Sequence, residues 1–189
     1  MTSSLQQAWE SAALRLFDDK YSLVAAGPRT HDDWRIDALA VMGRETTDPR
    51  GWAVLDWDFE GDSRRIEVGA SFPFVLPTSA RLAETLYEIT GASAAELLVA
   101  MTDDWFKAED IPGFAERKGE LLADAETLLS RFEPAGTYYT TARNAEATSK
   151  PDFFTEVTGG VNLTMLLMDL GLVAVSDSEI GVFWSFNDY

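Results

Sequence analysis

Five carboxylates lie close together in the first half of the chain, at a spacing that could hold a metal ion. They are Asp56, Asp58, Glu60, Asp62 and Glu67. Calcium-binding loops carry acids at positions 1, 3 and 5, glycine at position 6 and glutamate at position 12, because a tight turn at the glycine gathers hard oxygen ligands around one Ca²⁺. Counted from Asp56, this stretch has an acid at each of those positions and Gly61 at the turn. A calcium site is therefore one hypothesis for these residues.

The same acids can be explained without an ion. Glu60 fills a position where calcium loops favour Asp or Asn, and Ser63 replaces the usual apolar residue. Calcium loops of this pattern lie between helices, whereas the residues on both sides here alternate between apolar and polar, which indicates β-strands. In a β-hairpin, the acids would pair with Arg64 and Arg65 on the opposite strand. That arrangement requires no metal.

His31 is the only histidine, and it lies in the polar run Thr30-His31-Asp32-Asp33. A histidine beside carboxylates could transfer protons or bind a metal. With no second histidine and no cysteine, a zinc site would depend on carboxylates alone, which is unusual. Because polar runs of this kind are typical of surface loops, we expect a solvent-exposed histidine.

No other motif identifies catalytic residues or a cofactor. Ser71 follows Gly69-Ala70 but lacks the second glycine of a G-x-S-x-G nucleophile turn. The sequence contains neither a phosphate-binding loop nor a dinucleotide-binding fingerprint. We therefore predict no catalytic residue and no cofactor, and the motifs identify no protein family.

The elements that would position these residues follow from hydrophobic periodicity. Apolar and polar residues alternate on both sides of residues 60–63, which predicts a β-hairpin over residues 51–72. Further strands are predicted at 21–26, 36–42, 137–142, 153–157, 172–175 and 180–186. Helices are predicted at 5–17, 78–91, 93–111, 114–132 and 160–171.

The order of these elements indicates the fold class. Strands grouped before and after a block of helices, rather than alternating with them, are typical of α+β proteins. We expect a single domain over residues 1–189, with a largely antiparallel sheet, a central helical block and a C-terminal β-hairpin.

The tryptophans and the last strand add expectations about the core. Three tryptophans lie on apolar stripes and are predicted to be buried: Trp9, Trp57 and Trp105. The strand at 180–186 has Trp184 and Phe186 on one side and Phe183 on the other. We therefore expect both sides of the sheet to be covered at this strand.

The composition argues against several classes of protein. Of 189 residues, 32 are acidic and 15 are basic, and the formal net charge of -17 repels nucleic-acid phosphates and anionic lipid head groups. The absence of cysteine excludes disulfides and thiolate chemistry. The chain starts without a basic leader before an apolar run, and no apolar run is long enough to cross a bilayer. We expect a cytoplasmic protein that binds neither nucleic acid nor membrane.

The excess negative charge comes mostly from the residues after Arg50. No lysine or arginine follows Lys150, so the last acids have no basic neighbours in the sequence. Such a surface would attract a basic protein partner, although acidic surfaces also serve solubility.

These observations favour a non-catalytic, acidic protein-binding domain. Being small, acidic and free of cysteine, the chain resembles in general character the immunity-type inhibitors that neutralise a basic toxin or nuclease. The predicted partner-binding residues are Asp56, Asp58, Glu60 and Asp62. Two alternatives remain open. One is a small calcium-binding protein or carboxylate-based enzyme that uses the five acids with His31 as its base, and the other is a chaperone-like adaptor.

Overall fold

The computed structural model describes residues 2–18, 21–51 and 59–188. Its helices are α1 (Thr2–Phe17), α2 (Trp34–Met42), α4 (Ser63–Val68), α5 (Ser79–Thr85), α6 (Gly91–Ala100) and α7 (Phe114–Ser130). Single 3₁₀ turns lie at η1 (Gly69–Ser71), η2 (Ala108–Asp110) and η3 (Arg143–Ala145). The strands are β1 (Ser22–Pro28), β2 (Tyr87–Ile89), β3 (Thr137–Thr140), β4 (Met168–Val175) and β5 (Glu179–Asn187).

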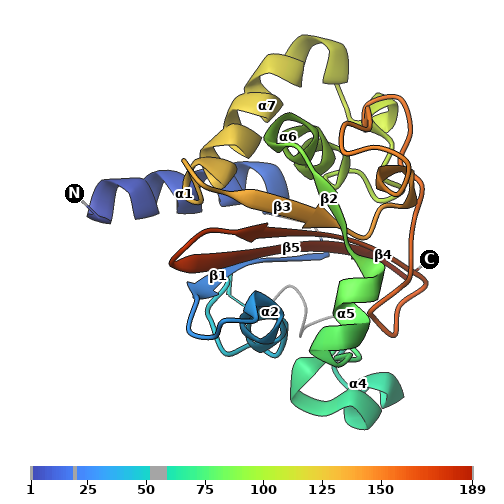
Figure 1. The fold of residues 1–189 in the computed structure, drawn as a ribbon. Coiled ribbons are helices and arrows are strands. Elements are labelled where there is room, and N and C mark those ends of the chain that lie inside the picture. The colour runs from blue at the N-terminus through green and yellow to red at the C-terminus, as the bar shows by residue number, and fades with distance from the viewer. Residues whose placement is uncertain (1, 19–20, 52–58, 189) are drawn as a thin grey trace.

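The strands form one five-stranded sheet in the order β1-β5-β4-β3-β2 (Figure 1), and every pairing is antiparallel. β4 and β5 make the predicted C-terminal hairpin, with Val175 opposite Ile180. β5 also pairs with β1, which places the first strand of the chain beside the last. The predicted α+β class with an antiparallel sheet is therefore confirmed.

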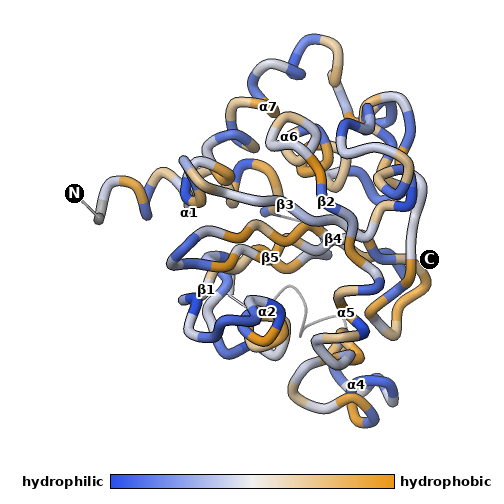
Figure 2. The backbone as a smooth tube through the Cα atoms, in the orientation of Figure 1, coloured by the Kyte–Doolittle hydropathy of each residue, from blue (hydrophilic) through white to orange (hydrophobic). Residues whose placement is uncertain are grey.

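Helices cover both faces of this sheet. In Figure 1, α1, α6 and α7 lie on one side, and α2 and α5 lie on the other. Side chains of β5 alternate between the two cores, so that Phe183 packs toward α1 and α7 while Trp184 packs toward α2 and α5. Figure 2 shows the apolar strands β4 and β5 in the middle of this arrangement. The expectation that the last strand is covered on both sides is confirmed.

Several predicted elements agree with the structure. Helices were expected where α1 and α7 lie, and strands where β1 and β3 lie. The helix predicted at 78–91 is shorter, because α5 ends at Thr85 and the chain continues into β2. Its predicted cap is correct, since the Thr78 side chain accepts a hydrogen bond from the Arg81 backbone N–H. In the next helix the cap is Thr90 rather than Ser93.

The strand predicted at 36–42 is wrong, because these residues form α2. Asp33 caps the helix by accepting a hydrogen bond from the Arg35 N–H, and Asp37 lies in the first turn. The apolar run from Ala38 to Met42 is compatible with either a buried strand or a buried helix, and the acids before it decide in favour of the helix.

The hairpin predicted over residues 51–72 is also wrong in its second arm. Residues 52–58 lie outside the described residues, and residues 63–68 form α4. Asp62 caps this helix, and Gly69 ends it at a positive φ of 78°, which glycine adopts without strain. Alternation would have placed Ile66 in the core, whereas this side chain is 80% exposed.

Two predicted elements near the C-terminus are also wrong. Residues 153–157 form turns rather than a strand, and the residues preceding Met168 form a loop rather than a helix. Gly171, expected to end that helix, lies inside β4 against the ring of Trp184. A methyl group at Gly171 would lie 2.1 Å from the Trp184 Cζ3 atom, so this strand position accepts only glycine without rearrangement.

No helix in the described parts of the chain is long and apolar enough to cross a membrane.

Candidate functional site

The five predicted site acids do not form one described cluster. Asp56 and Asp58 lie outside the described residues. Glu60 is exposed in the turn before α4, Asp62 caps that helix, and Glu67 is exposed near its end. Within the described residues, no group of three or more acids or histidines is arranged to hold a metal ion. The calcium site stays a prediction, since two of its five ligands fall outside the description.

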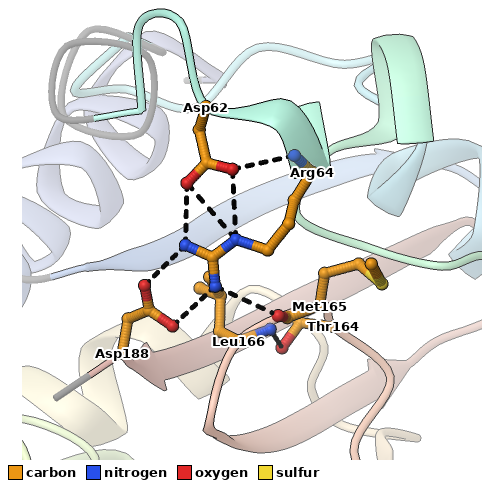
Figure 3. Close-up of polar contacts among 6 residues, drawn as sticks. All are labelled: Asp62, Arg64, Thr164, Met165, Leu166 and Asp188. Atoms are coloured by element: carbon orange, nitrogen blue, oxygen red, sulfur yellow. Dashed lines mark hydrogen bonds and ion pairs between the residues drawn. The ribbon is translucent and has the colours of Figure 1, made fainter. Parts of the chain in front are cut away.

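Asp62 belongs to a charged cluster that joins α4 to the C-terminal end of β5 (Figure 3). The Arg64 guanidinium contacts both Asp62, at 2.8 Å from Nη2 to Oδ2, and Asp188, at 2.7 Å from Nη2 to Oδ2. A second bond joins Arg64 Nη1 to Asp188 Oδ1 at 2.8 Å, and the same nitrogen donates to the Met165 carbonyl at 3.3 Å. These contacts fix α4 against residues that are far away in the sequence.

The electrostatics of this cluster follow from the pairing of one guanidinium with two carboxyl groups. Hydrogen bonds to Asp188 first, and to Asp62 second, raise the pKa of Arg64 above its ordinary value. Hydrogen bonds from the Arg64 side chain and backbone lower the pKa of Asp62. One guanidinium thus pairs with two carboxyl groups, and the formal charge of the three side chains is negative by one.

A loop at residues 102–107 contacts the end of β5 from the face of the sheet opposite α4, and it presents an exposed tryptophan. The Asn187 side chain donates to the Asp104 carbonyl at 3.0 Å, which places the loop at the end of β5. Asp103 Oδ2 accepts hydrogen bonds from the N–H groups of Trp105 and Lys107. Trp105 is 49% exposed, so its predicted core position is wrong, whereas the prediction for Trp9 is confirmed.

The backbone explains why Trp105 points outward. Phe106 is buried, and its φ of 61° lies in the left-handed region that bulky residues rarely adopt. This turn directs Phe106 into the core while its neighbour Trp105 stays in solvent. Such a strained position persists only where the surrounding structure holds it, and strained positions are concentrated at functional sites.

Several acids of the C-terminal segment have hydrogen-bonding or basic partners in the fold, although no lysine or arginine is close to them in the sequence. Glu179 accepts two hydrogen bonds from Arg131 of α7, at 3.0 and 2.6 Å. Asp188 binds Arg64, as described above. Asp169 is buried, and its carboxylate accepts hydrogen bonds from Leu163, Thr164 and Trp184. The same holds for the exposed Asp152, whose pKa is lowered by the hydrogen bond from the Thr155 hydroxyl and also by the charge of Lys118. The expectation of an uncompensated acidic segment is therefore wrong for these residues.

His31 is held by an acid that the sequence did not suggest. Its Nδ1 lies 2.7 Å from Oδ1 of the buried Asp37. Asp37 also accepts hydrogen bonds from the backbone N–H groups of Thr30 and His31, both at 3.0 Å, and from the Thr30 hydroxyl at 2.7 Å. Burial alone would raise the pKa of Asp37, but these bonds outweigh it and hold the pKa well below its ordinary value.

The prediction of a solvent-exposed loop histidine is confirmed, and Asp37 in addition fixes the orientation of the ring. Ser71 and His31 both line a groove beside α2, but the Ser71 hydroxyl donates to the Phe74 carbonyl at 3.0 Å. The described contacts therefore do not assemble a serine nucleophile with a histidine base.

The sequence motifs missed Asp37, Asp188 and Trp105. Asp37 would have been found by treating residues 34–42 as a helix capped by Asp33, because that helix places its first turn beside the loop of His31. No local signal connects Asp188 to Arg64, since the two are 124 positions apart. Comparison of the chain with family models, with curated proteins and with solved structures found no match.

Proposed function

We propose that this chain is a non-catalytic protein-binding domain whose acidic end binds a basic partner, as an immunity-type inhibitor would. The acidic end comprises residues of the turn before α4, of α4 itself, of the 102–107 loop and of the end of β5, namely Glu60, Asp62, Glu67, Asp103, Asp104, Asp188 and the exposed Trp105. The observation that carries the proposal is the combination of an exposed tryptophan with an arginine already occupied by two carboxylates.

Charge supports the proposal in two ways. Arg64 binds Asp62 and Asp188 at the same time, so it does not offset the further exposed acids Glu60 and Glu67. The whole chain carries a formal net charge of -17, which adds a long-range field of the same sign. Complementary fields accelerate the encounter of two proteins and weaken as salt rises.

Trp105 supplies what charge alone cannot, which is a large apolar surface that partner binding would remove from water. Tryptophan is among the residues that dominate binding energy at protein interfaces. Its ring also attracts arginine and lysine side chains through the cation–π interaction, which suits a basic partner. The proposal further assumes a cytoplasmic location.

The test uses the product of the gene adjacent to the one encoding this chain, the natural candidate for a toxin neutralised by an immunity-type protein. We expect a 1:1 complex by calorimetry, with affinity falling at least about tenfold between 50 and 300 mM salt. Glu60→Lys and Trp105→Ala should each weaken binding by about tenfold or more, equivalent to about 1.4 kcal/mol.

Glu126→Lys is the matched control, because it makes the same charge change on the exposed side of α7. It should alter affinity far less than Glu60→Lys does. Asp62 is unsuitable for this test, since its removal would also uncap α4. The absence of a complex, or a complex indifferent to salt and to both variants, would overturn the proposal.

A further inference from the structure

A groove separates α2 from the segment 68–76, on the side of the sheet opposite α7. Its volume is about 600 Å³, within the range of sites that bind small molecules or single side chains. The walls are mainly apolar and include Ile36, Leu39, Ala40, Val68, Ala70 and Leu76. We call this feature the α2 groove.

The two walls of the α2 groove are held together by contacts beneath it. Arg44, just after α2, donates from Nη2 to the Phe72 carbonyl at 2.6 Å. The backbone around Pro73 is fixed in turn to the loop before β4, because Met165 N–H donates to the Pro73 carbonyl and Val75 N–H to the Leu163 carbonyl, both at 2.9 Å. The groove is thus formed before any ligand arrives, which reduces the entropy cost of binding.

The polar side chains in the α2 groove present hydrogen-bond acceptors. The Thr30 hydroxyl donates to Asp37, and His31 Nδ1 lies 2.7 Å from the same carboxylate. When the imidazole is uncharged, a proton held at Nδ1 by Asp37 leaves the lone pair of the ring on Nε2. Ser71 donates its hydroxyl proton to the Phe74 carbonyl and retains only lone pairs. Glu45, the third polar side chain, is a carboxylate.

We propose that the α2 groove binds a cationic side chain, a guanidinium or ammonium group on an apolar stem, provided by the basic partner. Donors of the cation would face His31, Glu45 and Ser71, while its stem would lie on the apolar walls. An anion would meet the Glu45 carboxylate, and a purely apolar group would leave these acceptors without donors. That the cation belongs to a basic partner rests on the proposed function. That the groove prefers a cation follows from its own side chains and does not rest on that function.

The test uses small probes and needs no partner. Hexylguanidinium chloride is titrated into the ¹⁵N-labelled full chain, with sodium hexanoate and hexanol in parallel, and amide signals are followed by NMR. We expect saturable shifts for hexylguanidinium alone, concentrated at Ala40, Gly43 and Ser71. Glu45→Lys should weaken this binding about tenfold or more.

Two further variants make the result specific. Glu126→Lys applies the same charge change on α7 and should leave the titration unchanged. Trp105→Ala should also leave the titration unchanged, although this variant is expected to weaken partner binding. The groove proposal and the proposed function can therefore be overturned independently. Shifts equal for hexanol or hexanoate, shifts scattered over the surface, no shifts, or an equal loss in Glu126→Lys would overturn the groove proposal.

Discussion

Two buried aspartates, Asp37 and Asp169, perform the same local task with opposite electrostatic results. Each carboxylate accepts four hydrogen bonds and fixes a nearby loop, to α2 in the case of Asp37 and to β4 in the case of Asp169. The pKa of Asp37 lies well below its ordinary value, whereas burial raises the pKa of Asp169 despite bonds from Thr164 and Trp184. The number of hydrogen bonds therefore does not determine the direction of the shift.

Depth in the molecule and the nature of the donors explain the difference. Asp169 is the second residue of β4, and Trp184 of β5 donates to it from inside the core at 3.1 Å. Asp37 lies in the first turn of α2, close to solvent, and its partner His31 has a side chain that is 53% exposed. The deep acid thus serves the fold, while the shallow acid orients a side chain at a groove.

The largest effect is expected from Asp169→Ala. The substitution leaves the Leu163 and Thr164 N–H groups and the Trp184 Nε1–H without their acceptor inside the core. We expect a loss of about 3 kcal/mol or more in the free energy of unfolding, measured with urea. Asp177→Ala, in the exposed turn of the same hairpin, should change it by less than about 0.5 kcal/mol. A similar loss in both variants would contradict the structural role of Asp169.

A smaller effect is expected from Asp37→Ala. Near the surface, water can replace part of what Thr30 and His31 lose, so we expect a loss of about 1–2 kcal/mol in the same urea measurement. The exposed neighbour Asp32→Ala is the control and should be nearly neutral. A loss as large as that of Asp169→Ala would remove the distinction between the deep and the shallow acid.

The smallest and sharpest test is the pH dependence of stability. The lowered pKa of Asp37 gives stability that is present above the ordinary value of 3.8 and is lost as the pH falls below it. The raised pKa of Asp169 gives stability that is present below 3.8 and is lost as the pH rises toward the folded-state pKa.

Asn substitutions at each site isolate these contributions. From pH 3 to 6, the stability difference between wild type and Asp37→Asn should grow with pH, by about 1 kcal/mol. The difference between wild type and Asp169→Asn should shrink with pH. Slopes of the same sign for the two variants would show that the contrast between the two acids is wrong.

The sequence predicted those elements whose periodicity and end signals agree. In α7, the apolar stripe and the Pro112-Gly113 break point to the same helix, and the hairpin of β4 and β5 has a short polar turn between two apolar runs. Where periodicity and end signals disagree, the end signals agree with the structure. Asp62 and Gly69 define the ends of α4, even though Arg64, Ile66 and Val68 follow the alternation of a strand.

The candidate site was less predictable than the fold because its residues come together through tertiary structure. Asp62 was identified from its spacing, yet its partner Asp188 and the neighbouring Trp105 belong to distant segments. The loop before β4 shows the same limit. Leu163 and Leu166 are buried, as expected for the apolar stripe of a helix. The Asp169 carboxylate, however, accepts hydrogen bonds from the backbone N–H groups of this loop, and Leu167 is 59% exposed.

The place of β5 in the sheet has a consequence for how the protein is made. β1 precedes β5 in synthesis and contains the fully buried Leu23, Val24 and Ala25, yet its paired strand, β5, is the last in the described chain. While the intervening 150 residues leave the ribosome, β1 has an unsatisfied hydrogen-bonding edge of the kind that promotes aggregation. The buried residues of β1 therefore have no sheet partner until β5 has been translated.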